Sequence, residues 1–393
     1  MRARLAGSLA PMQGNRNSRA RRAGALAGIA ALAPLAALAS AEHANADQIQ
    51  ITNRHQSGKG SFAEAVRLAN KGHDRDLLVF SSRLSGSIRT RGATFDDAVA
   101  LRSKGSVTLN GRGRHANLSF NGENTKSHPG PASSVRDLRI RDMGIRVGDY
   151  AGMSISGVTL RGGSSEPAFG VYTNYYDDVS IRRSTISGFK FGVANYRSDV
   201  VVGDSVVSGN GVGVTNGYAG TEIVQSTITG NSEYGVEAGY YGDADLRDST
   251  VADNGGVGVF GDVEVYNSTV TGNNGAAESY DGDAATFVNS IVTGNKRSGG
   301  GPECGADAPR SLGGNLFGPA CAALATKKDV VAKDARLGPL KDNGGPTPTV
   351  ALKRGSPAIG LATDKATKKD QRGVPRGKDP DSGAYERSRK HPG

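Results

Sequence analysis

A short phrase returns six times along the middle of the chain: a hydroxyl residue, two β-branched residues and a polar turn. The phrases begin at Ser184, Ser205, Ser226, Ser249, Ser268 and Ser290. Successive phrases therefore lie 21, 21, 23, 19 and 22 residues apart. A fixed period near 20 residues is typical of a solenoid, in which each repeat forms one coil. The pattern predicts six stacked coils over residues 174–295, spaced by about 4.8 Å as strands of one sheet are.

Each repeat carries three short extended patches that Gly and Asn separate. The first alternates apolar and polar residues, as in residues 179–181, the phrase is the second, and a Gly-Val pair such as Gly192-Val193 is the third. Three β-rich strands per coil favour an all-β, right-handed parallel β-helix. A βαβ arrangement is excluded because no amphipathic helical stretch separates the strands, and Leu is too scarce for a leucine-rich repeat. An antiparallel sandwich stays open, although it does not require the period.

The second β-branched residue of each phrase is expected to point inward. Stacked over successive coils, these residues predict one apolar column in the core. The column comprises Val207, Ile228, Val251, Val270 and Val292.

An asparagine closes the phrase in five of the six repeats. Asn tolerates left-handed backbone and hydrogen-bonds nearby backbone groups, which suits a sharp turn. Stacked Asn side chains can also bond from coil to coil. We therefore predict a structural ladder rather than a ligand site. Its members are Asn210, Asn231, Asn254, Asn273 and Asn295.

The start of the chain has the layout of a secretory signal peptide. A basic run precedes an apolar stretch, residues 23–39, and two small-residue sites end at Ala41 and Ala46. This layout predicts a signal peptide over residues 1–46, cleaved after Ala41 or Ala46, with Met12 as an alternative start. The apolar stretch is short for a membrane span, and no transmembrane segment is expected in the mature chain.

The formal net charge of +10 conceals three different segments. Residues 174–295 carry five basic and sixteen acidic side chains, which gives −11, whereas residues 47–173 and 296–393 carry +7 and +9. No continuous basic surface follows the repeat, so nucleic acid is not an expected partner. The basic ends could contact an anionic wall polymer, and ordinary solvated charge explains them equally well.

The chain contains two cysteines, Cys304 and Cys321, both after the last regular repeat. In an oxidising compartment such a pair is expected to form a disulfide. The closed loop is short, so the chain-entropy model gives a stabilisation of about 3 kcal/mol. A metal site is the less favoured alternative because no His lies near.

Several segments of the first third resemble one family. Residues 57–70, SGKGSFAEAVRLAN, are similar to the segment that opens many secreted bacterial right-handed β-helix proteins. Residues 77–80, 84–88 and 107–111 resemble the first coils of that family.

The C-terminal motifs resemble the same family more specifically. Residues 337–349, LGPLKDNGGPTPT, and residues 355–359, 370–373 and 381–386 are similar to the end of β-helix proteins of the choice-of-anchor Q type. The resemblance implies a secreted bacterial β-helix protein. Gly360 departs from the Asp that the family usually has there, and no sorting motif or hydrophobic tail follows, so no anchor is expected.

Both ends are expected to cap the solenoid. Ser61 and Glu64 form a Ser-x-x-Glu capping box at a helix start. An apolar stripe on that helix could cover an open end, which otherwise exposes strand edges and core. The stripe comprises Phe62, Ala65, Val66 and Ala69.

We expect the Pro/Gly-rich C-terminal segment to cover the opposite end in the same way, with residues 361–380 as a solvated loop. The predicted organisation is a signal peptide over 1–46, an N-terminal cap with the first coils over 47–173, regular coils over 174–295 and a C-terminal cap over 296–393.

The turn that follows each Gly-Val pair repeatedly combines Tyr with an acid. Tyr can stack on sugar rings and hydrogen-bond their hydroxyls, and carboxylates can accept hydroxyls or hold Ca²⁺. This Tyr/acid stripe is the candidate ligand-binding site, and an ordinary polar turn is the alternative. The stripe comprises Tyr175, Tyr176, Asp177, Asp178, Tyr196, Asp199, Tyr218, Glu222, Tyr240, Tyr241, Asp243, Tyr280 and Asp281. The acids follow no Ca²⁺-loop motif, so no cofactor is expected.

No set of residues points to catalysis. A polysaccharide lyase needs a base and a cation for the uronate carboxylate, yet residues 174–295 contain no His and few basic residues. A hydrolase needs two carboxylates at a suitable spacing, and nothing selects a pair.

The sequence therefore predicts an exported, monomeric, extracellular or cell-envelope protein that binds polysaccharide without catalysis. A carbohydrate-active enzyme and a purely structural or adhesive spacer are the alternatives.

Overall fold

The computed structural model describes most of the chain after its first 47 residues. The described residues are 48–71, 75–113, 116–121, 132–148, 151–163, 168–175, 178–239, 241–279, 284–296, 303–305 and 309–387. They belong to one unit, Ala46–Gly393, and the other unit is Met1–Asn45. The predicted signal peptide lies outside the described residues.

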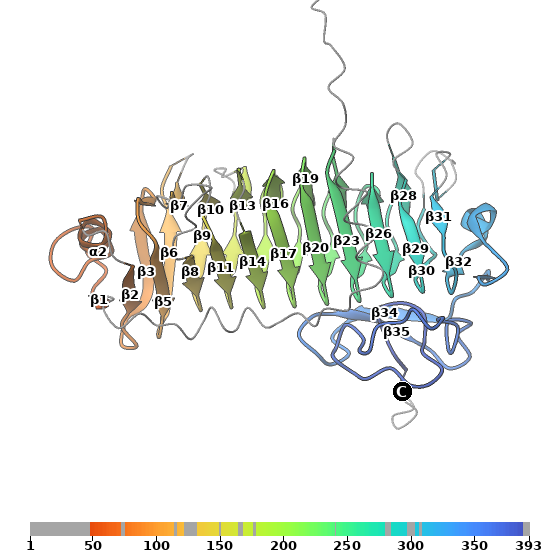
Figure 1. Cartoon of the computed structure of the whole chain (residues 1–393). Helices are drawn as coiled ribbons and strands as arrows, with labels where there is room; N and C mark the ends of the chain where they lie inside the picture. Colours follow the sequence, from red (N-terminus) through yellow and green to blue (C-terminus); the bar gives the residue numbers. More distant parts are fainter. Residues whose placement is uncertain are drawn as a thin grey trace, which may run out of the picture. The chain divides into compact units, whose positions relative to one another are not determined.

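Three parallel sheets run along the unit Ala46–Gly393 (Figure 1). Sheet A comprises β1 (Gln48–Ile51), β2 (Asp76–Phe80), β5 (Val99–Ser103), β8 (Ser133–Arg136), β11 (Met153–Ser156), β14 (Asp178–Arg182), β17 (Asp199–Gly203), β20 (Gly220–Val224), β23 (Asp243–Arg247), β26 (Val263–Tyr266), β29 (Thr286–Val288) and β31 (Arg310–Ser311). Sheet B comprises β3 (Ser85–Thr90), β6 (Ser106–Gly111), β9 (Arg139–Arg141), β12 (Thr159–Arg161), β15 (Thr185–Ser187), β18 (Val206–Ser208), β21 (Thr227–Thr229), β24 (Thr250–Ala252), β27 (Thr269–Thr271), β30 (Ile291–Val292), β32 (Leu316–Phe317) and β33 (Val330–Val331). Sheet C comprises β4 (Ala93–Phe95), β7 (Asn117–Phe120), β10 (Gly144–Val147), β13 (Phe169–Thr173), β16 (Phe191–Tyr196), β19 (Val212–Gly217), β22 (Val236–Ala238), β25 (Val259–Phe260) and β28 (Ala277–Glu278).

From β2 to β30 the chain visits sheets A, B and C in turn, and each strand pairs in parallel with the strand one coil away. This arrangement confirms the all-β parallel β-helix and rules out the antiparallel sandwich. The repeated phrase forms the strands of sheet B, the alternating patch those of sheet A, and the Gly-Val pair lies at the start of the strands of sheet C.

The predicted apolar column is present in sheet B. Val207 pairs with Ile228 and Ile228 with Val251. Val251 in turn pairs with Val270, which pairs with Val292. All five side chains have no solvent exposure. Parallel pairing in register places equivalent residues directly above one another, and this explains why the column is continuous.

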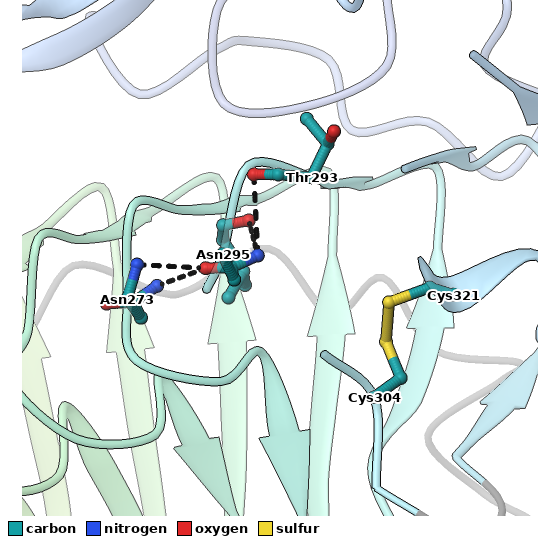
Figure 2. Close-up of a disulfide and its surroundings, with 6 residues drawn as sticks. Asn273, Thr293, Asn295, Cys304 and Cys321 are labelled. Carbon is teal, nitrogen blue, oxygen red and sulfur yellow. Dashed lines mark hydrogen bonds between the residues drawn. A yellow bond between two sulfur atoms is a disulfide. The ribbon is translucent and has the colours of Figure 1, made fainter. Parts of the chain in front are cut away.

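The asparagines bond from coil to coil at the turns from sheet B to sheet C. From Asn210 to Asn273, each backbone N–H and side-chain amide donates to the Oδ1 of the next asparagine at 2.8–3.1 Å. Figure 2 shows the last step, from Asn273 to Asn295. All five asparagines are buried, so these bonds satisfy polar groups that water cannot reach.

The first serines of the phrases form a second ladder, which sequence reasoning missed. The backbone N–H of each of the first five serines donates to the hydroxyl of the serine one coil further, as from Ser205 to Ser226 and from Ser226 to Ser249, both at 3.1 Å. The N–H of the last, Ser290, donates to the Asn315 side chain at 2.8 Å. The sequence did show the feature that predicts this ladder, because all six phrases begin with Ser. Sheet B is thus held by a hydroxyl ladder at one end and an amide ladder at the other.

The N-terminal helix α2 (Phe62–Ala69) packs on the first coils. The Ser61 hydroxyl accepts from the backbone N–H of Glu64 at 3.1 Å, as a capping box requires. The reciprocal bond is absent from the described contacts, because the Glu64 carboxylate instead pairs with Arg67 at 2.6 Å. Phe62 and the alanines of the predicted stripe are buried, whereas Val66 is only partly buried.

The 3₁₀ helix η2 (Pro319–Leu324) packs beside β32 at the end of the coils. A disulfide joins Cys304 and Cys321 there (Figure 2). The prediction of this disulfide is confirmed. Cys304 bridges in parallel to Ala277 of β28, and Cys321 lies in η2. The covalent bond therefore ties the last coil of sheet C to the helix that packs on the core.

The C-terminal segment, residues 337–387, lies along the outer face of sheet B and not across the open end, so that expectation was wrong. It contains the antiparallel pair β34 (Leu337–Lys341) and β35 (Thr349–Leu352). Outward threonines of sheet B hold it: the Gln371 side chain accepts from the Thr250 hydroxyl at 2.6 Å and donates to the Thr227 hydroxyl at 2.9 Å.

Residues 361–380 form a solvated loop only in part. Asp370 and Gln371 have no solvent exposure, and the Arg376 side chain is only 2% exposed. Arg376 pairs with Asp248 of the solenoid at 3.0 Å, while Asp370 accepts from Arg372 at 2.7 Å. The other charged residues of the segment, Asp364, Lys365, Lys368, Lys369, Lys378 and Asp379, are exposed, as charged residues mostly are.

Candidate functional site

Four tyrosines form a ladder at the turns that lead from sheet C to sheet A. The ring centroids of Tyr175 and Tyr196 lie 5.6 Å apart, and those of Tyr196 and Tyr218 lie 5.5 Å apart. The Tyr218 and Tyr241 rings follow at 5.6 Å. Tyr218 is 45% exposed and Tyr241 71% exposed, so the ladder faces solvent. We call these four residues the tyrosine ladder.

Arg197 lies within the tyrosine ladder. The register of sheet C, in which Thr173 pairs with Asn195, places Arg197 level with Tyr175 of the previous coil. Its guanidinium carbon lies 5.1 Å from the Tyr175 ring, 5.4 Å from Tyr196 and 4.8 Å from Tyr218. Each contact is in the range of a cation–π interaction. Sequence reasoning missed this residue, although a basic residue directly after Tyr196 was visible.

The backbone of the ladder is strained. Arg197, Tyr218 and Tyr241 have φ angles of 61°, 65° and 58°, in the left-handed region that favours glycine. The turn from sheet B to sheet C uses Gly209 and Gly230 at such angles, where no side chain opposes them. Holding a non-glycine residue there costs about 1–3 kcal/mol. The turns from sheet A to sheet B hold non-glycine residues at such angles too, as at Asp204, Gln225 and Asp248, so this backbone is a general feature of the coils.

A buried polar ladder behind the tyrosines fixes these turns. The Asn195 amide donates to the Ser198 carbonyl at 2.7 Å and its Oδ1 accepts from the Thr173 hydroxyl at 2.9 Å. One coil further, the Asn216 amide donates to the Asp243 carbonyl at 2.7 Å. Sequence reasoning missed these asparagines. The pattern that could have revealed them is an Asn that lies one or two residues before a Tyr of the ladder. They hold each turn to the next coil and so set the spacing of the rings.

Acids line sheet A beside the ladder, because alternate residues of its strands face outward. The first outward column contains Asp178, Asp199, Gly220 and Asp243, which pair in register, with Asp262 level with them in the next coil. The second contains Ser180, Val201, Glu222, Asp245 and Glu264. The third contains Arg182, Gly203, Val224, Arg247 and Tyr266.

Arg247 joins the second and third columns. Its guanidinium lies 3.1 Å from the Asp245 carboxylate, 3.8 Å from that of Glu222 and 4.7 Å from the ring of Tyr266. Burial raises the pKa of the Glu222 carboxyl, which Arg247 only partly opposes. Burial also raises the pKa of the Tyr266 hydroxyl, which donates to Glu264 at 2.9 Å. This cluster can donate and accept hydrogen bonds.

The structure brings some of the predicted stripe residues together and places others elsewhere. Tyr175, Tyr196, Tyr218 and Tyr241 come together in the ladder, and Asp178, Asp199 and Asp243 border it at the start of sheet A strands. Glu222 lies further along β20 on the outer face of sheet A, not in the turn. The remaining predicted residues, Tyr176, Asp177, Tyr240, Tyr280 and Asp281, lie outside the described residues.

Within the described ranges, no group of three or more His, Cys, Asp or Glu side chains could hold a metal ion. In that same part of the chain, no helix has the length and apolar character that crossing a membrane requires.

No curated protein matches the sequence. Nine solved chains match the structure, among them a periplasmic alginate epimerase, AlgG, at 14% identity over 66% of this chain and 69% of that chain, with a TM-score of 0.48. The pectate lyase Pel9A matches at 15% identity over 88% of this chain and 97% of that chain, also with a TM-score of 0.48. Neither likeness bears on function. The family model of the right handed beta helix region matches residues 96–245 and 169–310, more than half of the chain, and the protein therefore belongs to the right-handed β-helix family.

Proposed function

We propose that this protein binds polysaccharide along the tyrosine ladder and the adjoining outer face of sheet A, without transforming it. One observation carries the proposal: the rings of the tyrosine ladder stack at 5.5–5.6 Å from coil to coil, and Tyr218 and Tyr241 are 45% and 71% exposed. Exposed aromatic rings with a hydroxyl suit sugar faces, which are apolar and rimmed by hydroxyls.

The site is repeated along the solenoid, and each coil offers one shallow contact. Affinity for a glycan that lies along the ladder should therefore grow with its length, since every further sugar binds within the same complex. Isothermal titration calorimetry with oligosaccharides of increasing length, chosen from a glycan array, tests this. Paired Ala substitution of Tyr218 and Tyr241 is expected to weaken binding at least tenfold, at about 1.4 kcal/mol per tenfold.

A matched control is Tyr234→Ala. Tyr234 contacts Phe260 of sheet C, with ring centroids 5.0 Å apart, and is not part of the ladder. If no glycan binds, or if the ladder variant binds as well as the control, the ladder is a structural turn and the spacer alternative gains.

Export supports this function. The signal-peptide layout of residues 1–46 and the disulfide suit an oxidising compartment outside the cytoplasm. The C-terminal motifs support membership of the choice-of-anchor Q type. Sequencing the N-terminus of the secreted protein tests export: it should begin at Glu42 or Asp47, and an intact N-terminus would contradict the proposal. Gel filtration should show a monomer.

A carbohydrate-active enzyme is the second candidate, and Glu222 favours it. Burial holds its pKa above that of an ordinary carboxyl, and Asp245 binds the same guanidinium from the next coil. A glycosidase uses two carboxyls that flank the scissile bond. Release of reducing ends from the bound glycan, lost in Glu222→Gln, would establish it.

A further inference from the structure

The tyrosine ladder adjoins a notch between two carboxylates at Gly220, the first residue of β20. Gly220 occupies the first outward column, where Asp199 precedes it and Asp243 follows it by one coil. A Cβ at Gly220 would lie 3.9 Å from Asp243 Oδ2 and 4.0 Å from Asp199 Oδ1. Both carboxylates thus border the space that the missing side chain leaves.

The notch lies directly beside the stacking surface. Tyr218 precedes Gly220 by two residues, and Tyr241 precedes Asp243 by two residues. The two rings are 5.6 Å apart and both are exposed. A ligand that stacks on these rings therefore presents its edge to the two carboxylates.

The net charge of the surrounding protein face determines which charge the ligand should carry at that edge. The outward columns of β14, β17, β20, β23 and β26, extended to Asp262, hold seven acids (Asp178, Asp199, Glu222, Asp243, Asp245, Asp262, Glu264) and two arginines (Arg182, Arg247). Seven negative and two positive charges give −5, and Arg197 brings the face to −4. Such a field repels an anionic polymer and attracts a cationic one.

Resting on the proposed function, we propose that the ligand is a glycan with free amino groups, and that one ammonium group sits in the notch over Gly220 between Asp199 and Asp243. A sugar ammonium group, like that of lysine, has three donors. It can bond both carboxylates through charge-assisted hydrogen bonds while its ring lies on Tyr218. Two carboxylates alone supply too few oxygens for Ca²⁺, which takes about 6–8.

Calorimetry with four oligosaccharides of equal length tests the charge selection: a glucosamine oligomer, its N-acetylated counterpart, a neutral glucose oligomer and an oligouronate. The glucosamine oligomer should bind about tenfold more tightly than the N-acetylated one, as expected for one charge-assisted contact. Its affinity should fall with added salt, while that of the neutral glucan stays constant.

Two kinds of variant test the notch itself. Gly220→Val fills it with both carboxylates in place. The backbone tolerates the change because Gly220 has no left-handed φ and, among the residues that the structure describes, a Cβ there meets only ordinary contacts. Asp199→Asn combined with Asp243→Asn removes the charge and keeps the shape. Both should abolish the preference for the glucosamine oligomer. Asp178→Asn, in the same column two coils from Gly220, is the control and should retain it.

The outcomes separate this inference from the proposed function. Equal affinity for the amino and N-acetylated oligomers, or unchanged binding in both notch variants, overturns the notch, while loss of binding in the Tyr218 and Tyr241 variant still supports the ladder. Oligouronate binding that needs added Ca²⁺ and that the notch variants abolish also overturns it in favour of a metal site. If none of the four oligosaccharides binds, both proposals fall.

Discussion

Substitutions at Tyr218 test whether the ladder backbone is strained. At most positions an Ala variant is more stable than a Gly variant, and the left-handed backbone at Tyr218 should reverse that order. At φ 65° a Cβ is opposed by the backbone, so Tyr218→Ala keeps the strain and Tyr218→Gly relieves it. Both variants lose the same ring contacts with Tyr196, Tyr241 and Arg197, so these contributions cancel in the comparison. We expect the Gly variant to be more stable than the Ala variant by about 1–2 kcal/mol.

Against the wild type, Tyr218→Gly should lose about 1 kcal/mol of unfolding free energy. Losing two aromatic contacts costs about 0.5–1.5 kcal/mol each, and the exposed cation–π contact about 0.5–1 kcal/mol, in a ladder open to solvent. Relief of the strained backbone offsets most of this loss. Glycan binding should nevertheless weaken, because the ring is gone.

Urea unfolding followed by circular dichroism measures these differences, and Tyr196 supplies the control. Tyr196 is a neighbour in the same ladder and lies in strand β16 with no left-handed φ. There Gly should be less stable than Ala by about 0.5–1 kcal/mol, the ordinary order. If the Ala variant of Tyr218 is as stable as the Gly variant, the backbone at Tyr218 is not strained.

Three further predictions concern the fold. Ile228→Asp should lower the free energy of unfolding by several kcal/mol, because it buries an unpaired charge in the apolar column, whereas Thr229→Asp on the outer face should change it little; equal melting temperatures would show that the strand phase is misassigned. Burial raises the pKa of Asp248 from 3.8 to about 6, so the folded state binds this proton more tightly and the contribution of Asp248 to stability is lost as pH rises from 3.8 through 6. Asp248→Asn should flatten the fall in unfolding free energy over that interval in urea titrations, and an unchanged slope would contradict the shift. Thiol titration of the secreted, unfolded protein without reductant should find Cys304 and Cys321 unreactive, and two free thiols per chain would refute the disulfide.

Much of the candidate site was accessible from the sequence for one physical reason. In a solenoid, residues at equivalent positions of successive repeats stack, so a recurring Tyr such as Tyr196 or Tyr218 implies a ladder before any coordinates are known. The same logic leads from the phrase to the inward column and to the asparagines. The search for one residue type recurring at one position overlooked Arg197, Asn195 and Asn216. Equivalent positions of successive coils stack even where the residue type changes.

The period and the residue types of the repeat by themselves determined the fold class, the sheet that each patch joins and the inward column, because parallel pairing in register is a local rule repeated coil by coil. Only the tertiary structure decided what requires contacts between distant segments. It placed residues 337–387 along sheet B, where Gln371 meets Thr227 and Thr250 more than a hundred residues earlier in the chain. It also brought Asp199 and Asp243 together over Gly220, because that notch depends on the exact register of three coils and on the absence of one side chain.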